Sequence, residues 1–127
     1  MKGRLRGLTV SVIGGDRRAV FMAEELLREG AQVKLAGHTV SLPSIQVVTT
    51  VGAAVRGADA VVFPLPGVRD DGSVTASAEP LLVREEDLAF LHEGVPVFTG
   101  FAGHYLGKLA DRLQLRLVEV APRDDFA

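Results

Sequence analysis

The sequence contains no cysteine and no tryptophan, and only three of its 127 residues are histidines. The absence of cysteine excludes a disulfide scaffold, a thiolate nucleophile, and zinc or iron-sulfur sites of the cysteine type. The histidines, His38, His92 and His104, have no mutual spacing that indicates a catalytic triad or a metal cluster. We therefore predict no metal site.

An excess of basic residues is also missing, because 14 Lys+Arg stand against 16 Asp+Glu for a formal net charge of -2. This balance argues against a nucleic-acid partner. No apolar run approaches the length of about 18 residues that spans a bilayer. The run at residues 8–13 is too short for a signal peptide and ends at Gly14-Gly15-Asp16. We expect a soluble, cytoplasmic protein with no nucleic-acid or membrane partner.

What the sequence does contain is a regular alternation of short apolar runs with longer amphipathic segments. It predicts strands at residues 8–13, 31–36, 59–63, 95–98 and 115–120, and helices at residues 17–29, 51–56, 84–92 and 103–113. Residues 45–48 fit either a short edge strand or an extended loop. Residues 64–80 are rich in Gly, Pro, Asp and Ser, and predict a long loop that is functional or mobile.

This alternation predicts an α/β fold with one doubly wound, mainly parallel, five-stranded sheet of the flavodoxin-like or Rossmann-like kind. Right-handed crossovers favour the strand order 2-1-3-4-5. The composition, 47% hydrophobic, is enough for one domain with its own core, which we place at residues 1–121. Residues 122–127 are polar and are predicted to begin a linker.

Ligands of such sheets bind outside the carboxyl ends of the strands, which directs attention to the loops there. At Gly14-Gly15-Asp16 a strand turns into a helix, and three interpretations stay open. The turn could bind a dinucleotide, although Asp16 stands where the fingerprint has its second glycine. It could be structural, with Asp16 as the N-cap. It could bind a small carboxylate, to which Arg17 and Arg18 offer planar guanidinium groups.

Other candidates at the same edge are weaker. Thr99 and Gly100 begin a second glycine-rich turn, which is either structural or able to bring backbone amides to a ligand. His38 and His104 are either ordinary residues or proton carriers. Asp70-Asp71-Gly72 is more typical of a turn than of a metal-binding carboxylate pair.

Four motifs in order give the chain a family resemblance. They are Val12-Ile13-Gly14-Gly15-Asp16-Arg17 after a short basic leader, Pro64-Leu65-Pro66, Phe98-Thr99-Gly100, and Arg123-Asp124-Asp125. With them the chain resembles the N-terminal domain of the dipicolinate synthase A subunit over essentially its whole length.

The resemblance implies a part in the NADP-dependent oxidation of a dihydrodipicolinate-type precursor to dipicolinate, the pyridine dicarboxylate of bacterial endospores. It implies the B subunit of the synthase, flavoprotein-like in fold, as a partner. It also implies a following dinucleotide-binding domain, so that NADP belongs to the full enzyme and this domain binds no cofactor alone.

Our hypothesis is that the domain forms the substrate-side wall of the active site; a homo-oligomer is possible. Arg17 is the expected carboxylate clamp, and the catalytic residues are unknown. The expected substrate-binding residues are Gly14, Gly15, Asp16, Arg17, Arg18, His38, Thr99, Gly100 and His104.

The alternative is a non-catalytic module that docks the B subunit or dimerises through residues 64–80 and the exposed sheet edge. A response regulator is disfavoured because the first strand lacks a terminal acidic pair.

Overall fold

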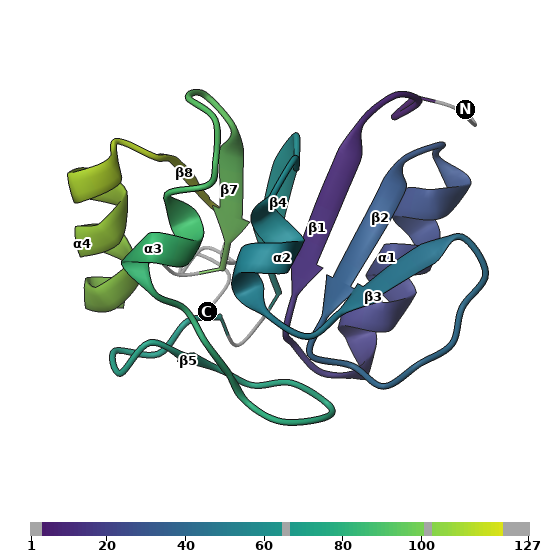
Figure 1. Ribbon diagram of the computed structural model, residues 1–127, viewed down its shortest axis with the longest axis horizontal. Helices are drawn as coiled ribbons and strands as arrows, with labels where there is room; N and C mark the ends of the chain where they lie inside the picture. The colour runs from purple at the N-terminus through teal and green to yellow at the C-terminus, as the bar shows by residue number, and fades with distance from the viewer. Residues whose placement is uncertain (1–3, 65–66, 101–102, 121–127) are drawn as a thin grey trace, which may run out of the picture.

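The computed structural model describes residues 4–64, 67–100 and 103–120, and shows one parallel sheet with helices on both faces (Figure 1). The elements, in chain order, are β1 (Thr9–Ile13), α1 (Arg17–Arg28), β2 (Gln32–Ala36), β3 (Ile45–Val48), α2 (Val51–Val55), β4 (Ala60–Phe63), β5 (Ser73–Val74), β6 (Leu81–Leu82), α3 (Glu85–Leu88), β7 (Pro96–Thr99), α4 (Gly103–Leu113) and β8 (Arg116–Glu119).

The main sheet has six strands in the order β3-β2-β1-β4-β7-β8, and all neighbours are parallel. The five predicted strands keep the predicted order, which confirms the α/β, doubly wound, Rossmann-like class. The sheet has one strand more than the five predicted, because Ile45–Val48 forms the edge strand β3 beside β2. The order is that of Rossmann folds, in which the chain reverses direction across the sheet between its two central strands, here β1 and β4.

Two apolar cores hold the helices on the sheet. On one face, Val61 and Val97 pack with Leu106 of α4 and with residues of α2 and α3. On the other face, Val12 and Leu35 pack under Ala19 and Ala23 of α1. Figure 1 shows α2, α3 and α4 in front of the sheet and α1 behind it, under β2 and β3. Alternation along each strand supplies both faces, as a parallel sheet requires.

The connection from β4 to β7 differs most from its prediction. Instead of a structureless loop, residues 67–83 form a strap in which β5 and β6 pair as an antiparallel ladder, and Val68 bridges Val74. Figure 1 shows the strap crossing beyond the carboxyl ends of β1 and β2. Hydrogen bonds that involve side chains attach the strap to the rest of the fold. The His38 ring bonds to Ser77, the Tyr105 hydroxyl donates to Val83 O, and His104 N donates to an Asp70 oxygen.

Helix α3 is shorter than the predicted helix at residues 84–92, whereas α4 has the predicted bounds, residues 103–113. The start of α3 is well marked, because the Asp87 carboxylate accepts from Arg84 N at 3.1 Å in a capping box. After Leu88 the backbone continues in turns, with Phe90 N donating to Asp87 O. His92 therefore lies beyond the helix that it was expected to end.

Candidate functional site

A cavity of about 250 Å³ opens at the carboxyl ends of β4 and β7, on the α1 side of the sheet. It lies beside the β1–β4 reversal, where ligands of Rossmann folds bind. Its lining is largely apolar, with one charged group at its rim. The lining residues are Arg18, Met22, Val62, Phe63, Pro64, Phe98, Thr99, Gly100 and Val120. The structure thus brings together three of the predicted site residues, Arg18, Thr99 and Gly100.

Arg18 is held at the rim by Asp16, the residue that directly precedes α1. Asp16 is the N-cap, as one interpretation of the sequence predicted, and its Oδ1 accepts from Arg18 N at 2.9 Å. Its carboxylate also pairs with the Arg18 guanidinium, through Nε at 3.0 Å and Nη2 at 2.7 Å. The hydrogen bonds that the Asp16 carboxylate accepts from the Arg18 side chain, and to a smaller extent from the Arg18 backbone N–H, lower the pKa of Asp16 to about 2. The pair is therefore an ion pair at neutral pH.

Asp16 leaves part of the guanidinium open to a ligand. Within the described residues, no acceptor is paired with Arg18 Nη1. The Arg18 side chain is largely exposed, at 71%. Since carboxylates accept short, strong hydrogen bonds from guanidinium groups, Nη1 can donate to an anion in the cavity while Asp16 keeps the side chain in place.

The Gly14-Gly15 turn is covered by the strap rather than open to a ligand. Gly15 N donates to Thr75 O at 2.6 Å, and Gly14 N donates to Ala36 O at 2.9 Å. A Cβ added to Gly14 would overlap Val74 and lie 2.8 Å from Thr75 O. A Cβ added to Gly15 would instead lie 2.9 Å from Pro64 Cβ. Both glycines have positive φ, +74° and +83°, which favours glycine at both positions. Both amides are therefore already bonded within the protein.

His38 is buried under the same strap, with 3% of its surface exposed. Its Nε2 lies 2.8 Å from Gly14 O, and because a carbonyl only accepts, Nε2 carries the hydrogen. Its Nδ1 lies 2.8 Å from Ser77 Oγ. Both ring nitrogens are engaged, so this geometry gives His38 the role of joining β2, the glycine turn and the strap.

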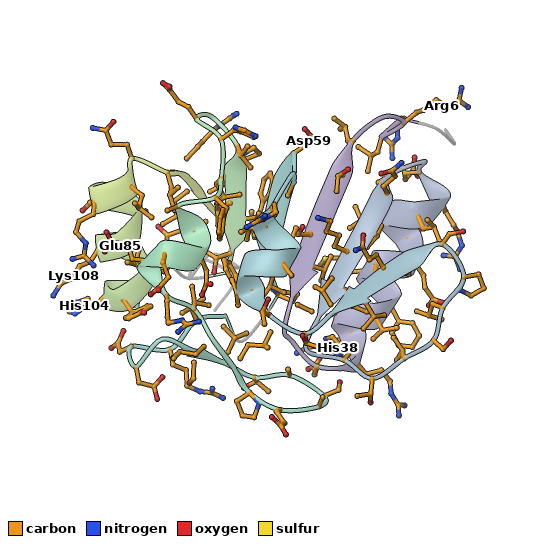
Figure 2. All side chains as sticks on the ribbon, in the orientation of Figure 1. Arg6, His38, Asp59, Glu85, His104 and Lys108 are labelled. Atoms are coloured by element: carbon orange, nitrogen blue, oxygen red, sulfur yellow. The ribbon has the colours of Figure 1, made fainter. Side chains whose placement is uncertain are left out.

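Arg17 and His104 lie away from the cavity. Both are exposed, and neither lines it. Figure 2 shows His104 on α4, far across the molecule from His38. The structure therefore does not bring these two histidines together, and the roles assigned to Arg17, His38 and His104 in substrate binding stay predictions.

The apolar cavity lining was not predicted as part of a site. Met22, Val62, Phe98 and Val120 look like ordinary core residues in the sequence. The sequence feature that could have predicted this lining is strand alternation, which places Val62 and Phe98 on one face of the sheet. Only the sheet order shows that this face meets α1. A second hollow, of about 540 Å³, lies over the ends of β2 and β3 and is lined by residues that include His38, Thr50 and Arg84.

The remaining candidates are structural in the described residues. Asp71 Oδ1 accepts from Ser73 N at 2.9 Å, which makes Asp70-Asp71-Gly72 the turn that was predicted.

In residues 4–64, 67–100 and 103–120 no cluster of three His, Asp or Glu could hold a metal ion. No helix of this part has the length and apolar character to cross a membrane. Leu65 and Pro66 of the Pro64-Leu65-Pro66 motif, the Arg123-Asp124-Asp125 motif and the predicted linker at 122–127 lie outside the described residues.

Comparison with known proteins decides the family. The sequence profile of the N-terminal domain of the dipicolinate synthase A subunit matches residues 9–121. The chain belongs to this family. The A subunit of Bacillus subtilis strain 168 is 25% identical over 97% of the chain, which covers 43% of that protein. The crystal structure of the A subunit from Bacillus halodurans superposes with a TM-score of 0.86 at 25% identity, over 97% of the chain and 43% of that structure.

Solved dehydrogenases share the fold. A D-isomer specific 2-hydroxyacid dehydrogenase from Xanthobacter autotrophicus Py2, solved with NADPH, has a TM-score of 0.65 at 20% identity, over 94% of the chain and 52% of that structure. This likeness shows the Rossmann-like fold. The chain is thus a Rossmann-like domain of the A-subunit family, and it spans less than half the length of the dipicolinate synthase chains it matches.

Proposed function

We propose that this chain is the substrate-side domain of an NADP-dependent dipicolinate synthase that acts in the cytoplasm during sporulation. In the reaction, a dihydrodipicolinate-type precursor loses a hydride to NADP+, which becomes NADPH, and releases a proton to give dipicolinate. The dinucleotide would be held by a further domain, and the B subunit is the proposed partner.

The observation that carries this proposal is the strap. In a dinucleotide site the pyrophosphate lies against the glycine turn and the N-terminus of the following helix. Here Gly15 N is bonded to Thr75 O and Val74 occupies the space beside Gly14. The residues of this chain therefore do not fit NADP at this turn, which supports the assignment of the cofactor to another domain.

The cavity, in contrast, suits one end of a flat dicarboxylate. Val62, Phe98 and Pro64 offer apolar contacts for a ring, and Arg18 Nη1 offers a charged donor at the rim. The adjacent turn at Gly100 allows close approach of the backbone. We assign the carboxylate clamp to Arg18, since Arg17, favoured by the sequence, does not line the cavity.

Alanine substitutions of the two neighbouring arginines test the proposal in the active synthase. Losing a charge-assisted hydrogen bond costs about 1.5 to 3 kcal/mol, so Arg18→Ala should lower kcat/KM roughly tenfold to a hundredfold. Arg17→Ala is the matched control, one residue away and also exposed, and should leave kcat/KM within about twofold of the unsubstituted enzyme. A loss with Arg17→Ala alone would restore the assignment to Arg17. No loss with either variant would contradict a substrate role for this helix terminus.

The second candidate function is a module that docks the B subunit or dimerises. The observation in its favour is the apolar lining of the cavity, with Val120 61% exposed. If Arg18→Ala leaves both binding to the B subunit and turnover unchanged, docking is favoured as the sole role of this domain.

A further inference from the structure

The hollow of about 540 Å³ over the carboxyl ends of β2 and β3 is separate from the cavity assigned to the substrate, and the two share no lining residue. One wall of the hollow is residues 78–82 of the strap. Ala78 N donates to Gly37 O at 3.0 Å, and the neighbouring Ser77 Oγ lies 2.8 Å from His38 Nδ1. These bonds hold the strap against the end of β2, so this wall of the hollow has a fixed position.

The start of α3 brings a positioned guanidinium group to the same hollow. The buried Asp87 carboxylate accepts from Arg84 N at 3.1 Å, and its Oδ2 lies 3.6 Å from Arg84 Nε. A Cβ added to Gly52 would lie 3.0 Å from Asp87 Oδ1, so the carboxylate also packs against α2. Asp87 thus keeps Arg84 in place, while within the described residues the two Nη groups of Arg84 have no hydrogen-bond partner.

The strap adds a charge of the opposite sign. Glu79 lines the hollow and is exposed, and among the residues that the structure describes its carboxylate has neither a hydrogen bond nor an ion pair. Arg84 pairs with Asp87 and not with Glu79, although both Arg84 and Glu79 line the hollow. Two opposite charges that border one hollow without pairing can each bind a group of a molecule that carries both charges.

The remaining lining suits the other parts of such a molecule. Thr39 and Thr49 bring hydroxyl groups, which both donate and accept hydrogen bonds. Val48, Leu81 and Leu82 offer apolar contacts, and Leu82 is 54% exposed. Ligand sites in proteins typically combine an apolar lining with a few polar groups that fix the orientation of the ligand.

We propose that this hollow binds a small zwitterion, an α-amino acid with an aliphatic side chain. The carboxylate bonds to the Nη groups of Arg84, since a guanidinium group donates two parallel hydrogen bonds to a carboxylate. The ammonium group pairs with Glu79, and the side chain packs against Leu81 and Leu82. The bound amino acid joins the strap to the start of α3. A dianion such as dipicolinate does not fit, because Glu79 and Asp87 repel its second carboxylate.

An NMR titration of the chain with matched analogues tests the proposal. L-Leucine carries both charges, 4-methylpentanoate lacks the ammonium group, and 3-methylbutylamine lacks the carboxylate. We expect L-leucine to shift the backbone amide signals of Thr49, Leu82 and Arg84. Each single-charge analogue should bind about fivefold or more weakly, because it loses one ionic contact at a partly exposed site.

Charge-removing variants assign the two contacts. Glu79→Gln and Arg84→Gln each remove one charge at an exposed position, and Arg84→Gln keeps the backbone N–H that donates to Asp87. Each variant should weaken the binding of L-leucine about fivefold or more. Glu93→Gln and Arg116→Gln are the matched controls. Both positions are exposed and neither lines the hollow, so the binding of L-leucine should be unchanged.

Two results would overturn the proposal. Equal binding of 4-methylpentanoate and L-leucine, together with no effect of Glu79→Gln, would make the hollow a site for anions rather than for zwitterions. No shift with glycine, L-alanine or L-leucine up to about 20 mM would mean that the hollow is not an amino-acid site. Neither result bears on the proposed substrate cavity, which is tested through Arg18, Thr99 and Gly100.

Discussion

At the scale of single residues, Asp16 performs two tasks that are joined through one neighbour. It caps α1 by accepting from Arg18 N, and it holds the Arg18 guanidinium at the cavity rim. The cap satisfies a backbone donor that the helix cannot satisfy itself. The same carboxylate therefore links the local stability of α1 to the position of the proposed carboxylate clamp.

The titration of Asp16 tests this link. Its native pKa of about 2 lies below the ordinary value of 3.8, so the ionised form is favoured by folding. The stability it adds is fully present above about pH 4 and is lost as the pH falls through about 2. The carboxyl carbon of Asp16, followed by NMR, should titrate near pH 2. After Arg18→Ala its pKa should rise but stay below 3.8, because the backbone N–H of residue 18 still donates to the carboxylate. Salt should raise the midpoint, because the pair is exposed. A midpoint near 3.8 in the unsubstituted chain would contradict the pairing.

At the scale of elements, the strap decides what the glycine turn can do. The sequence predicts the strand-to-helix turn from Gly14, Gly15 and Asp16, and the N-cap that the structure shows at Asp16 is one of the three interpretations it leaves open. It does not show that Val74 and Thr75, far along the chain, close the turn. Strands of two residues carry no periodic signal, so β5 and β6 could not be predicted.

A glycine substitution measures how firmly the strap closes the turn. Gly14→Ala should destabilise the protein by about 3 kcal/mol, since it adds a clash with Val74 to the strain of a positive φ. Gly57→Ala is the matched control, because its φ of +75° is almost that of Gly14, +74°, while nothing lies within 4 Å of an added Cβ. It should cost about 1 kcal/mol. Urea unfolding gives both values, and equal losses would mean that the strap does not pack against Gly14.

Regular elements were predictable where periodicity and end signals agree. Helix α4 has its predicted bounds because Leu106, Leu109 and Ala110 repeat at helical spacing between clear ends. β3 stayed open because an edge strand is only partly buried, and Gln46 and Val47 are exposed. The end of α3 was misplaced because apolar residues continue at helical spacing after Leu88, although the backbone turns there.

At the scale of the whole molecule, the sheet order separates two regions that look alike in the sequence. Both glycine-rich turns lie at the carboxyl edge. The one after β1 is filled by the protein itself, and the one after β7 borders an open cavity. This difference is a tertiary property, since it depends on where the β4–β7 connection crosses the sheet. It is the reason why we place the substrate, and not the cofactor, on this domain.

The most direct test is an NMR titration of the chain with dipicolinate and, separately, with NADP+. The account predicts that dipicolinate shifts the backbone amide signals of Arg18, Thr99 and Gly100, while NADP+ leaves those of Gly14 and Gly15 unchanged. Shifts at Gly14 and Gly15 with NADP+, and none at Thr99 and Gly100 with dipicolinate, would contradict it and make this domain the cofactor-binding one.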